Sequence, residues 1–350
     1  MNLKLFFDDI VKQNSQHAED LTDDTWGAAT TIKIYNSITS LYGASWTLIH
    51  QLGAEERIYS LCYLGNGIVL AGTALTGQIY KSTDYGDTWT LIQQLGIETY
   101  AYSLCYLGNG IVLAGTYQYG TIYKSTDYGD NWSFVQRLGA EIYAYSLCYL
   151  GNGIVLAGTA AHGQIYKSTD YGDHWSLIQQ LGAEIYVLSL SYLGNGIVLA
   201  GTAAHGQIYK SIDYGDTWTL IQQLGTELFV YSLSYLDSGI VLAGTSTHGQ
   251  IYKSTDYGAS WNLIQQLGTE TRAYSLCYLG NGIVLAGTYP TGQIYKSTDY
   301  GDTWTLIQQL GIETDVYSLC YLDRGFVIAG TATHGQIYKT APASTEVLHD

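Results

Sequence analysis

The sequence predicts an all-β fold: a seven-bladed β-propeller of four-stranded antiparallel blades. Tryptophan recurs every 43 residues from Trp46 to Trp304, and a repeat of about 40 to 50 residues is typical of propellers and solenoids. The 41 glycines and 34 tyrosines suit short strands joined by tight turns. Glycine also returns too often for a helical stripe to persist.

One repeat accounts for four strands. The first, Tyr59–Leu64, precedes Gly65-Asn66-Gly67, whose residues tolerate the positive φ angles of a tight hairpin. The second, Ile68–Thr73, is apolar enough to be covered on both faces. Gln78–Ser82 and Trp89–Leu95 are the third and fourth strands.

The two ends of the repeat array are predicted to complete one blade. The last repeat supplies Tyr317–Leu322, Phe326–Thr331 and Gln336–Thr340 but no fourth strand. Trp46–Leu52 matches the missing strand, so we expect it to close the ring and remove an open sheet edge. Thr31–Ser37 also resembles a third strand, and the sequence leaves open which copy takes that place.

Two segments flank the propeller predicted over residues 31–340: an extension at 1–30 and a tail at 341–350. The extension is expected to form a short helix and an acidic linker. One helix face would carry Leu3, Phe6, Phe7, Ile10 and Val11. The extension either packs on its own propeller or docks on a partner or a sister subunit.

Composition excludes several partners. The net charge is −16, and the 14 lysines and arginines do not cluster, which argues against nucleic acid and against an anionic membrane surface. No apolar run reaches the roughly 18 residues of a membrane span. The apolar patch Leu3–Phe7 is followed at once by Asp8 and Asp9, unlike a signal peptide.

All five cysteines occupy one position of the repeat, which holds serine in two other copies. An odd number of thiols in one repeated position is unsuited to disulfides. We therefore expect small buried thiols in a reducing location such as a cytoplasm or a virion. These residues are Cys62, Cys105, Cys148, Cys277 and Cys320.

The turn between the third and fourth strands reads Ser-x-Asp-x-Gly-x-Thr-Trp. In its first copy, Ser82 and Asp84 can accept hydrogen bonds from turn amides, Gly86 allows positive φ, and Trp89 covers the hairpin. Five further copies follow at the same spacing, and the copy ending at Trp46 is degenerate.

This motif resembles that of the Asp-box (BNR, sialidase-like) β-propellers over about residues 31–340. The resemblance implies that the box is a structural staple remote from any ligand. Its other aspartates and tryptophans are Asp127, Trp132, Asp170, Trp175, Asp213, Trp218, Asp256, Trp261, Asp299 and Trp304. Calcium binding by Asp84 and Asp87 is a weaker alternative, because two carboxylates are few for that ion and Ala259 replaces one of them in its copy.

Catalysis is not expected, and no cofactor or metal is indicated. Enzymes of the sialidase-like group use three arginines, a Tyr/Glu pair and an acid, whereas this chain has only Arg57, Arg137, Arg272 and Arg324. Arg57 and Arg272 share one position five repeats apart, so we expect the arginines not to converge. Asp315 is the one acid unique to its position, and it has no obvious partner.

Two connections vary while the strands barely change, and both should emerge on one face of the ring. Such loops on a rigid frame are where binding residues usually lie. The connection between blades carries Arg57, Tyr100, Tyr143, Tyr186, Phe229, Arg272 and Asp315. The connection between the second and third strands carries Tyr117, Tyr119, His162, His205, His248, Tyr289 and His334.

We therefore expect a non-enzymatic propeller that binds a glycan or glycoconjugate through these aromatic and polar side chains. The alternatives are a structural component of a larger assembly, such as a virion or multiprotein complex, docked through residues 1–30, and an assembly factor. An invariant glutamate adjoins each variable position, and it is either a turn acceptor or part of an acidic collar. These are Glu55, Glu98, Glu141, Glu184, Glu227, Glu270 and Glu313.

Overall fold

The computed structural model describes residues 45–340, which form 28 β-strands and one short 3-10 helix. The first half comprises β1 (Trp46–Gln51), β2 (Ile58–Gly65), β3 (Ile68–Thr73), β4 (Gln78–Ser82), β5 (Thr90–Gln94), β6 (Tyr100–Gly108), β7 (Ile111–Tyr117), β8 (Thr121–Ser125), β9 (Ser133–Arg137), β10 (Tyr143–Gly151), β11 (Ile154–Ala160), β12 (Gln164–Ser168), β13 (Ser176–Gln180) and β14 (Tyr186–Gly194). The second half comprises β15 (Ile197–Ala203), β16 (Gln207–Ser211), β17 (Thr219–Gln223), β18 (Phe229–Asp237), β19 (Ile240–Ser246), β20 (Gln250–Ser254), β21 (Asn262–Gln266), β22 (Arg272–Gly280), β23 (Ile283–Tyr289), β24 (Gln293–Ser297), β25 (Thr305–Gln309), β26 (Asp315–Tyr321), η1 (Asp323–Gly325), β27 (Val327–Ala332) and β28 (Gln336–Thr340).

The strands form four-stranded antiparallel blades in which chain neighbours pair, as β2 to β5 show. The predicted second and third strands agree with β3 and β4. The first strand is one residue longer at each end than predicted, and β5 omits Trp89 and Leu95. Trp89 instead belongs to the preceding turn, where its indole N–H donates to the carbonyl of Gly86 at 2.8 Å.

The strand β1 completes the sheet that contains β26, β27 and β28. It runs antiparallel to β28, with Trp46 opposite Thr340 and Gln51 opposite Gln336. The third-strand position that the sequence left open is therefore filled by Gln336–Thr340. Thr31–Ser37, the extension 1–30 and the tail 341–350 lie outside the described residues.

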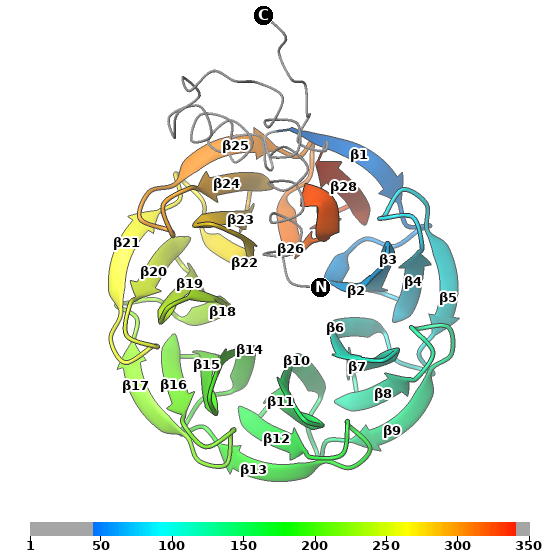
Figure 1. The fold of residues 1–350 in the computed structure, drawn as a ribbon, viewed down its shortest axis with the longest axis horizontal. Helices are drawn as coiled ribbons and strands as arrows, with labels where there is room; N and C mark the ends of the chain where they lie inside the picture. The colour runs from blue at the N-terminus through cyan, green and yellow to red at the C-terminus, as the bar shows by residue number, and fades with distance from the viewer. Residues whose placement is uncertain (1–44, 341–350) are drawn as a thin grey trace, which may run out of the picture. The chain divides into compact units, whose positions relative to one another are not determined.

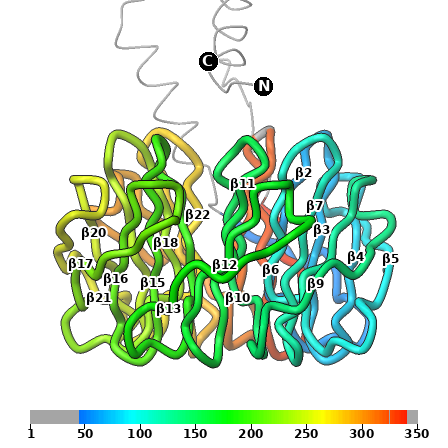
Figure 2. The backbone as a smooth tube through the Cα atoms, turned by 90° about the horizontal axis from the view of Figure 1, so that it is seen from below, coloured from blue at the N-terminus to red at the C-terminus, as the bar shows by residue number. Residues whose placement is uncertain are grey.

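Within residues 45–340, the blades stand side by side around a common centre, with the first strand of each innermost and the fourth outermost (Figure 1). Seen edge-on, the strands run between two opposite faces at which the chain turns (Figure 2). Hydrogen bonds join the two variable connections: Gly77 donates to Thr99 at 2.9 Å, and Gln118 donates to Ile142 at 2.9 Å. Both connections thus share one face, the loop face. The turns that carry the Ser-x-Asp-x-Gly-x-Thr-Trp motif, the box turns, lie on the opposite face, the box face.

The core lies between neighbouring blades. One cluster joins Leu64 and Leu70 of one blade to Val112 and Trp132 of the next, and equivalent clusters recur around the centre. Leu70 and Val112 are fully buried, and full burial of such a side chain is worth about 1.5–3 kcal/mol. Because each blade alone would expose this surface, stacking supplies most of the stabilisation.

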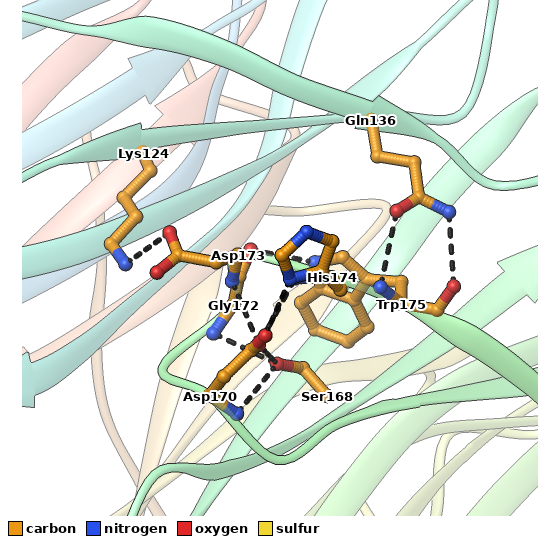
Figure 3. Close-up of polar contacts among 8 residues, drawn as sticks. All are labelled: Lys124, Gln136, Ser168, Asp170, Gly172, Asp173, His174 and Trp175. Carbon is orange, nitrogen blue, oxygen red and sulfur yellow. Dashed lines mark hydrogen bonds and ion pairs between the residues drawn. The ribbon is translucent and has the colours of Figure 1, made fainter.

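Each box turn is a network of local hydrogen bonds, shown for one copy in Figure 3. The hydroxyl of Ser168 donates to Asp170 at 2.8 Å and accepts from the amide of Gly172 at 2.9 Å. The other carboxylate oxygen of Asp170 lies 2.6 Å from Nδ1 of His174. The indole of Trp175 donates to the carbonyl of Gly172 at 3.0 Å. The box therefore ties one turn together with its own side chains.

Polar side chains also join neighbouring blades (Figure 3). The amide of Gln136 donates to the Trp175 carbonyl at 3.0 Å and accepts from the Trp175 backbone N–H at 3.1 Å. The ammonium of Lys124 lies 2.7 Å from Asp173. The hydroxyl of Ser146 donates to the carbonyl of Val187, in the next innermost strand, at 3.2 Å. Repeated around the molecule, these contacts fix the relative position of adjacent blades.

The five cysteines are free thiols. Burial raises the pKa of Cys105 and Cys148 to about 12, so these thiols remain protonated. Across residues 45–340, no helix has the length and apolar character needed to cross a membrane.

Candidate functional site

The variable position between blades lies where each innermost strand begins. Tyr100, Tyr143, Tyr186, Phe229, Arg272 and Asp315 are the first residues of β6, β10, β14, β18, β22 and β26. Arg57 immediately precedes β2 and forms a bridge with Ala332. We call these seven residues the rim, since they surround the centre at the loop face.

Aromatic side chains occupy four consecutive positions of the rim, from Tyr100 to Phe229. The ring of Tyr117 lies 4.9 Å from Tyr100 and stacks on Tyr143 at 4.3 Å. The ring of Tyr143 lies 6.4 Å from that of Tyr186. The rings from Tyr100 to Tyr186 therefore form a continuous, half-buried surface, and the ring of Phe229 stacks on Tyr231 at 5.5 Å.

Charged side chains occupy the other three positions, Arg272, Asp315 and Arg57. The ring of Tyr317, two residues after Asp315, lies 4.4 Å from Tyr274 and 4.9 Å from Tyr59. Each of these two tyrosines accepts a hydrogen bond from the arginine two residues before it. Arg57 and Arg272 thus lie at the rim positions on either side of Asp315, although five repeats separate them in the chain.

Asp315 lies in this charged part of the rim and is 7% exposed. It accepts a hydrogen bond from Thr314 at 2.6 Å, a partner that the sequence did not reveal. Burial raises the pKa of the Asp315 carboxyl, and the nearby Arg57 and Arg272 partly offset that effect. Within residues 45–340, neither arginine forms an ion pair with a carboxylate.

The invariant glutamates are buried acceptors beneath the loop face, which confirms the turn-acceptor interpretation against the acidic collar. All seven are at most 5% exposed. Thr76 donates to Glu55 and Thr291 donates to Glu270. Burial nevertheless raises the pKa of Glu55, and its Oε2 has no hydrogen-bond partner.

Four histidines replace threonine as partners of these glutamates. Nδ1 of His162 lies 2.6 Å from Glu141, and His205, His248 and His334 repeat the contact with Glu184, Glu227 and Glu313. The Nδ1 atom of each imidazole is thus occupied by a glutamate, and Nε2 is left for other partners. The four imidazoles are 38–52% exposed.

Tyr119 and Tyr289 interact with cations of the loop face instead. The guanidinium of Arg137 lies 4.3 Å from the centre of the Tyr119 ring. The guanidinium of Arg272 lies 4.6 Å from that of Tyr289. Tyr119 occupies the position that holds a histidine in other repeats. In this repeat Thr121 donates to Glu98 at 2.7 Å instead, and Glu98 therefore keeps a hydrogen-bond donor.

Sequence reasoning missed a series of tyrosines just inside the rim. Their centroid distances are 4.3 Å for Tyr59–Tyr102, 4.7 Å for Tyr102–Tyr145 and 4.8 Å for Tyr231–Tyr274. Leu188 holds the equivalent position in the remaining copy. The signal was available, because a tyrosine precedes the conserved serine of β2 and its equivalents in six of seven repeats.

A cavity of about 260 Å³ lies at the centre. It is lined by serines and leucines of the innermost strands and by Tyr59, Tyr102, Tyr145, Tyr274 and Tyr317. The serines point to their neighbours: Ser103 and Ser318 donate to the carbonyls of Ala144 and Ile58 in adjacent blades. Burial raises the pKa of Tyr102 and Tyr145 well above the usual value, so both phenols stay neutral. The centre is therefore an uncharged, aromatic-lined space.

Within the described part of the chain, no group of three or more His, Cys, Asp or Glu side chains could hold a metal ion. The four loop-face histidines accordingly sit singly, each on its own glutamate. What the loop face offers is a continuous aromatic surface, two guanidinium groups and a set of oriented imidazoles, which suits binding.

Comparisons with known proteins place the fold. No family model matches the chain, and no curated protein matches it. Among solved structures, it is similar to YCF48 bound to D1 peptide, with 16% identity, a TM-score of 0.67, and coverage of 85% of this chain and 94% of that one. It is also similar to YCF48 from Cyanidioschyzon merolae, with 14% identity, a TM-score of 0.67, and coverage of 85% and 98%. A third is the WD40 β-propeller domain of Doa1, with 16% identity, a TM-score of 0.68, and coverage of 85% and 97%. The fold is that of a β-propeller.

Proposed function

We propose that this chain is a non-enzymatic binding propeller whose loop face takes up a polypeptide segment of a partner protein. One observation carries the proposal. The positions that differ between otherwise near-identical repeats gather at one face, over a frame that hardly changes. Buried aromatic and arginine side chains are the groups that most often dominate protein–protein binding energy.

A polypeptide suits this face better than the glycan that the sequence suggested. Sugars stack on open ring faces, whereas the rings of Tyr117 and Tyr143 cover each other at 4.3 Å. The rim also combines apolar surface with two guanidinium groups that have no carboxylate partner within residues 45–340. A similar solved propeller is described as bound to a peptide. Docking through residues 1–30 stays a prediction, since those residues lie outside the described part.

The proposal includes a ring of seven blades closed by β1, with Asp-box turns as staples. Contacts across the seam between β26–β28 and β2 support it, because they repeat those found elsewhere. Ser318 donates to the Ile58 carbonyl at 3.3 Å, just as Ser275 donates to Val316 at 3.3 Å. Six boxes carry the serine–aspartate hydrogen bond of 2.7–2.8 Å, which supports membership of the Asp-box group.

Selection of a displayed library of random 12-residue peptides on the full chain tests this function. Enriched peptides should lose binding to a Tyr100→Ala/Tyr143→Ala/Phe229→Ala variant by at least about a hundredfold, as expected for loss of several interface anchors. A Tyr171→Ala variant, altered on the box face, should bind like the wild type. The proposal fails if no peptide is enriched, or if the rim variant binds unchanged.

A further inference from the structure

Three consecutive blades share a set of loop-face residues that the other blades lack. In the blade β10–β13 the set is Ile142 with His162, in β14–β17 it is Ile185 with His205, and in β18–β21 it is Leu228 with His248. Elsewhere the aliphatic position is polar, reading Glu56, Thr99, Thr271 and Thr314. The two positions are 20 residues apart in each repeat, and the last repeat carries the histidine alone, with Thr314 and His334.

Hydrogen bonds arrange these six residues in an alternating row. Within a blade, the glutamate just before Ile142 holds the imidazole of His162 at 2.6 Å. Between blades, the amides of Ala161 and Gly163, on either side of His162, donate to the carbonyl of Ile185 at 3.1 and 2.9 Å. The same pair of contacts recurs from the connection holding His205 to Leu228, at 3.2 and 2.9 Å. We call this row the Ile–His strip: Ile142, His162, Ile185, His205, Leu228 and His248.

The strip is exposed although half of it is aliphatic. Ile142, Ile185 and Leu228 are 42%, 44% and 46% exposed. The imidazoles between them are 45–52% exposed, and each is fixed through Nδ1 on a buried carboxylate. Nε2 is left for a partner, so the strip offers apolar contacts separated by hydrogen-bonding imidazole nitrogens.

We infer that the Ile–His strip binds an extended polypeptide segment whose apolar side chains are separated by groups that hydrogen-bond to the imidazoles. This deepens the proposed function and rests on it. Such a segment turns every second side chain to the same face, so apolar and hydrogen-bonding side chains can follow one another along the strip. The aromatic residues Tyr143, Tyr186 and Phe229 follow the aliphatic ones in sequence and border the strip toward the centre. Peptide, not sugar, is favoured because exposed aliphatic groups give a sugar nothing to hydrogen-bond.

Other repeats of the same chain supply the test variants. The triple change Ile142→Thr/Ile185→Thr/Leu228→Thr installs the residue found at positions 99, 271 and 314. A second variant, His162→Thr/His205→Thr/His248→Thr, keeps a donor for each glutamate, as Thr76 and Thr291 show. The control is Ile97→Thr/Ile312→Thr. These two isoleucines are 67% and 77% exposed and lie in connections between blades, outside the strip. Two other repeats carry threonine at the equivalent position, as Thr226 and Thr269.

Fluorescence anisotropy with the peptides enriched on the full-length wild type gives the readout, after thermal melting has shown that each variant folds. Each single aliphatic change should weaken binding about tenfold and the triple change more than about a hundredfold. The histidine variant should also weaken binding, and the control should stay within about twofold of the wild type.

The outcomes separate the two proposals. If the Tyr100/Tyr143/Phe229 variant loses binding but the strip variants do not, the strip inference falls and the proposed function stands. If no peptide binds the loop face, both fall. An oligosaccharide array that yields ligands lost in the strip variants, with no peptide ligand, overturns the polypeptide assignment.

Discussion

Replacing His50 with glutamine should strengthen the contact between β1 and the neighbouring blade. The equivalent glutamine elsewhere makes two hydrogen bonds to the backbone of a tryptophan in the next blade, as Gln179 does with Trp218 at 3.2 and 3.1 Å. His50 occupies that position in β1, opposite Ile337 as Gln93 is opposite Ile79. No such bond joins His50 to Trp89 within the described residues.

The magnitude follows from the number of bonds restored. A typical hydrogen bond contributes about 1 kcal/mol net, so two should add about 2 kcal/mol to the free energy of unfolding. At about 2 cal/mol/K of unfolding entropy per residue over roughly 300 residues, this raises the melting temperature by about 3 °C.

Differential scanning calorimetry of the wild type and H50Q measures this gain. The matched control is Gln179→His, which removes the same two bonds at an interior junction and should lower the melting temperature by a similar amount. If Q179H is destabilised while H50Q melts no higher than the wild type, the two junctions are not equivalent. The assumption that β1 meets the blade β2–β5 in the same way as other neighbouring blades meet would then be refuted.

Burial raises the pKa of Glu98 above its ordinary value of 4.5. The protonated Glu98 side chain therefore stabilises the folded state fully below pH 4.5, and this stabilisation is lost as the pH rises through the pKa of the folded state. Burial would also raise the pKa of Asp127, but hydrogen bonds from Asn131 and Ser125 bring it to about 2, so its contribution is present above pH 3.8 and lost as the pH falls toward 2. Melting temperature should therefore peak near pH 4 to 5, roughly between these windows, and Glu98→Gln should flatten the fall toward pH 7. Cys105 has a pKa of about 12 because it is buried, so iodoacetamide at neutral pH should alkylate it at least about a hundredfold more slowly in the folded protein than in guanidinium chloride. Thr121→Gln should cost about 1–3 kcal/mol by removing the donor of Glu98, and adding Tyr119→His should restore it; chemical denaturation of both variants checks this coupling.

The repeat made most of the fold predictable. The second and third strands, the positive-φ turn at Asn66 and the pairing of an N-terminal strand with Gln336–Thr340 all follow from comparing copies within one chain. Strand ends were less predictable, because Trp89 is as apolar as a strand residue yet belongs to the turn. Local pattern cannot tell which of two roles an apolar residue takes at such a boundary.

The candidate site was harder to predict for a geometric reason. Positions that are far apart in a linear repeat array become neighbours around a centre, which is how Arg272 and Arg57 come to flank Asp315. The tyrosine series escaped notice for the opposite reason. Tyr59 and its equivalents hardly vary, and a comparison that looks for differences passes over residues that are the same in nearly every copy.

Compensating changes argue against simple drift at the loop face. Where Tyr119 cannot serve Glu98, the glutamine found two residues further on in the other repeats has become Thr121, whose hydroxyl takes over that hydrogen bond. A buried carboxylate without a donor costs free energy, so the frame tolerates variation only when that donor is kept. The exposed aliphatic residues Ile142, Ile185 and Leu228 satisfy no such requirement, because their backbone bonds are those that threonine makes at position 271. Their joint occurrence with histidine in three neighbouring blades is therefore the observation on which the proposed polypeptide partner rests.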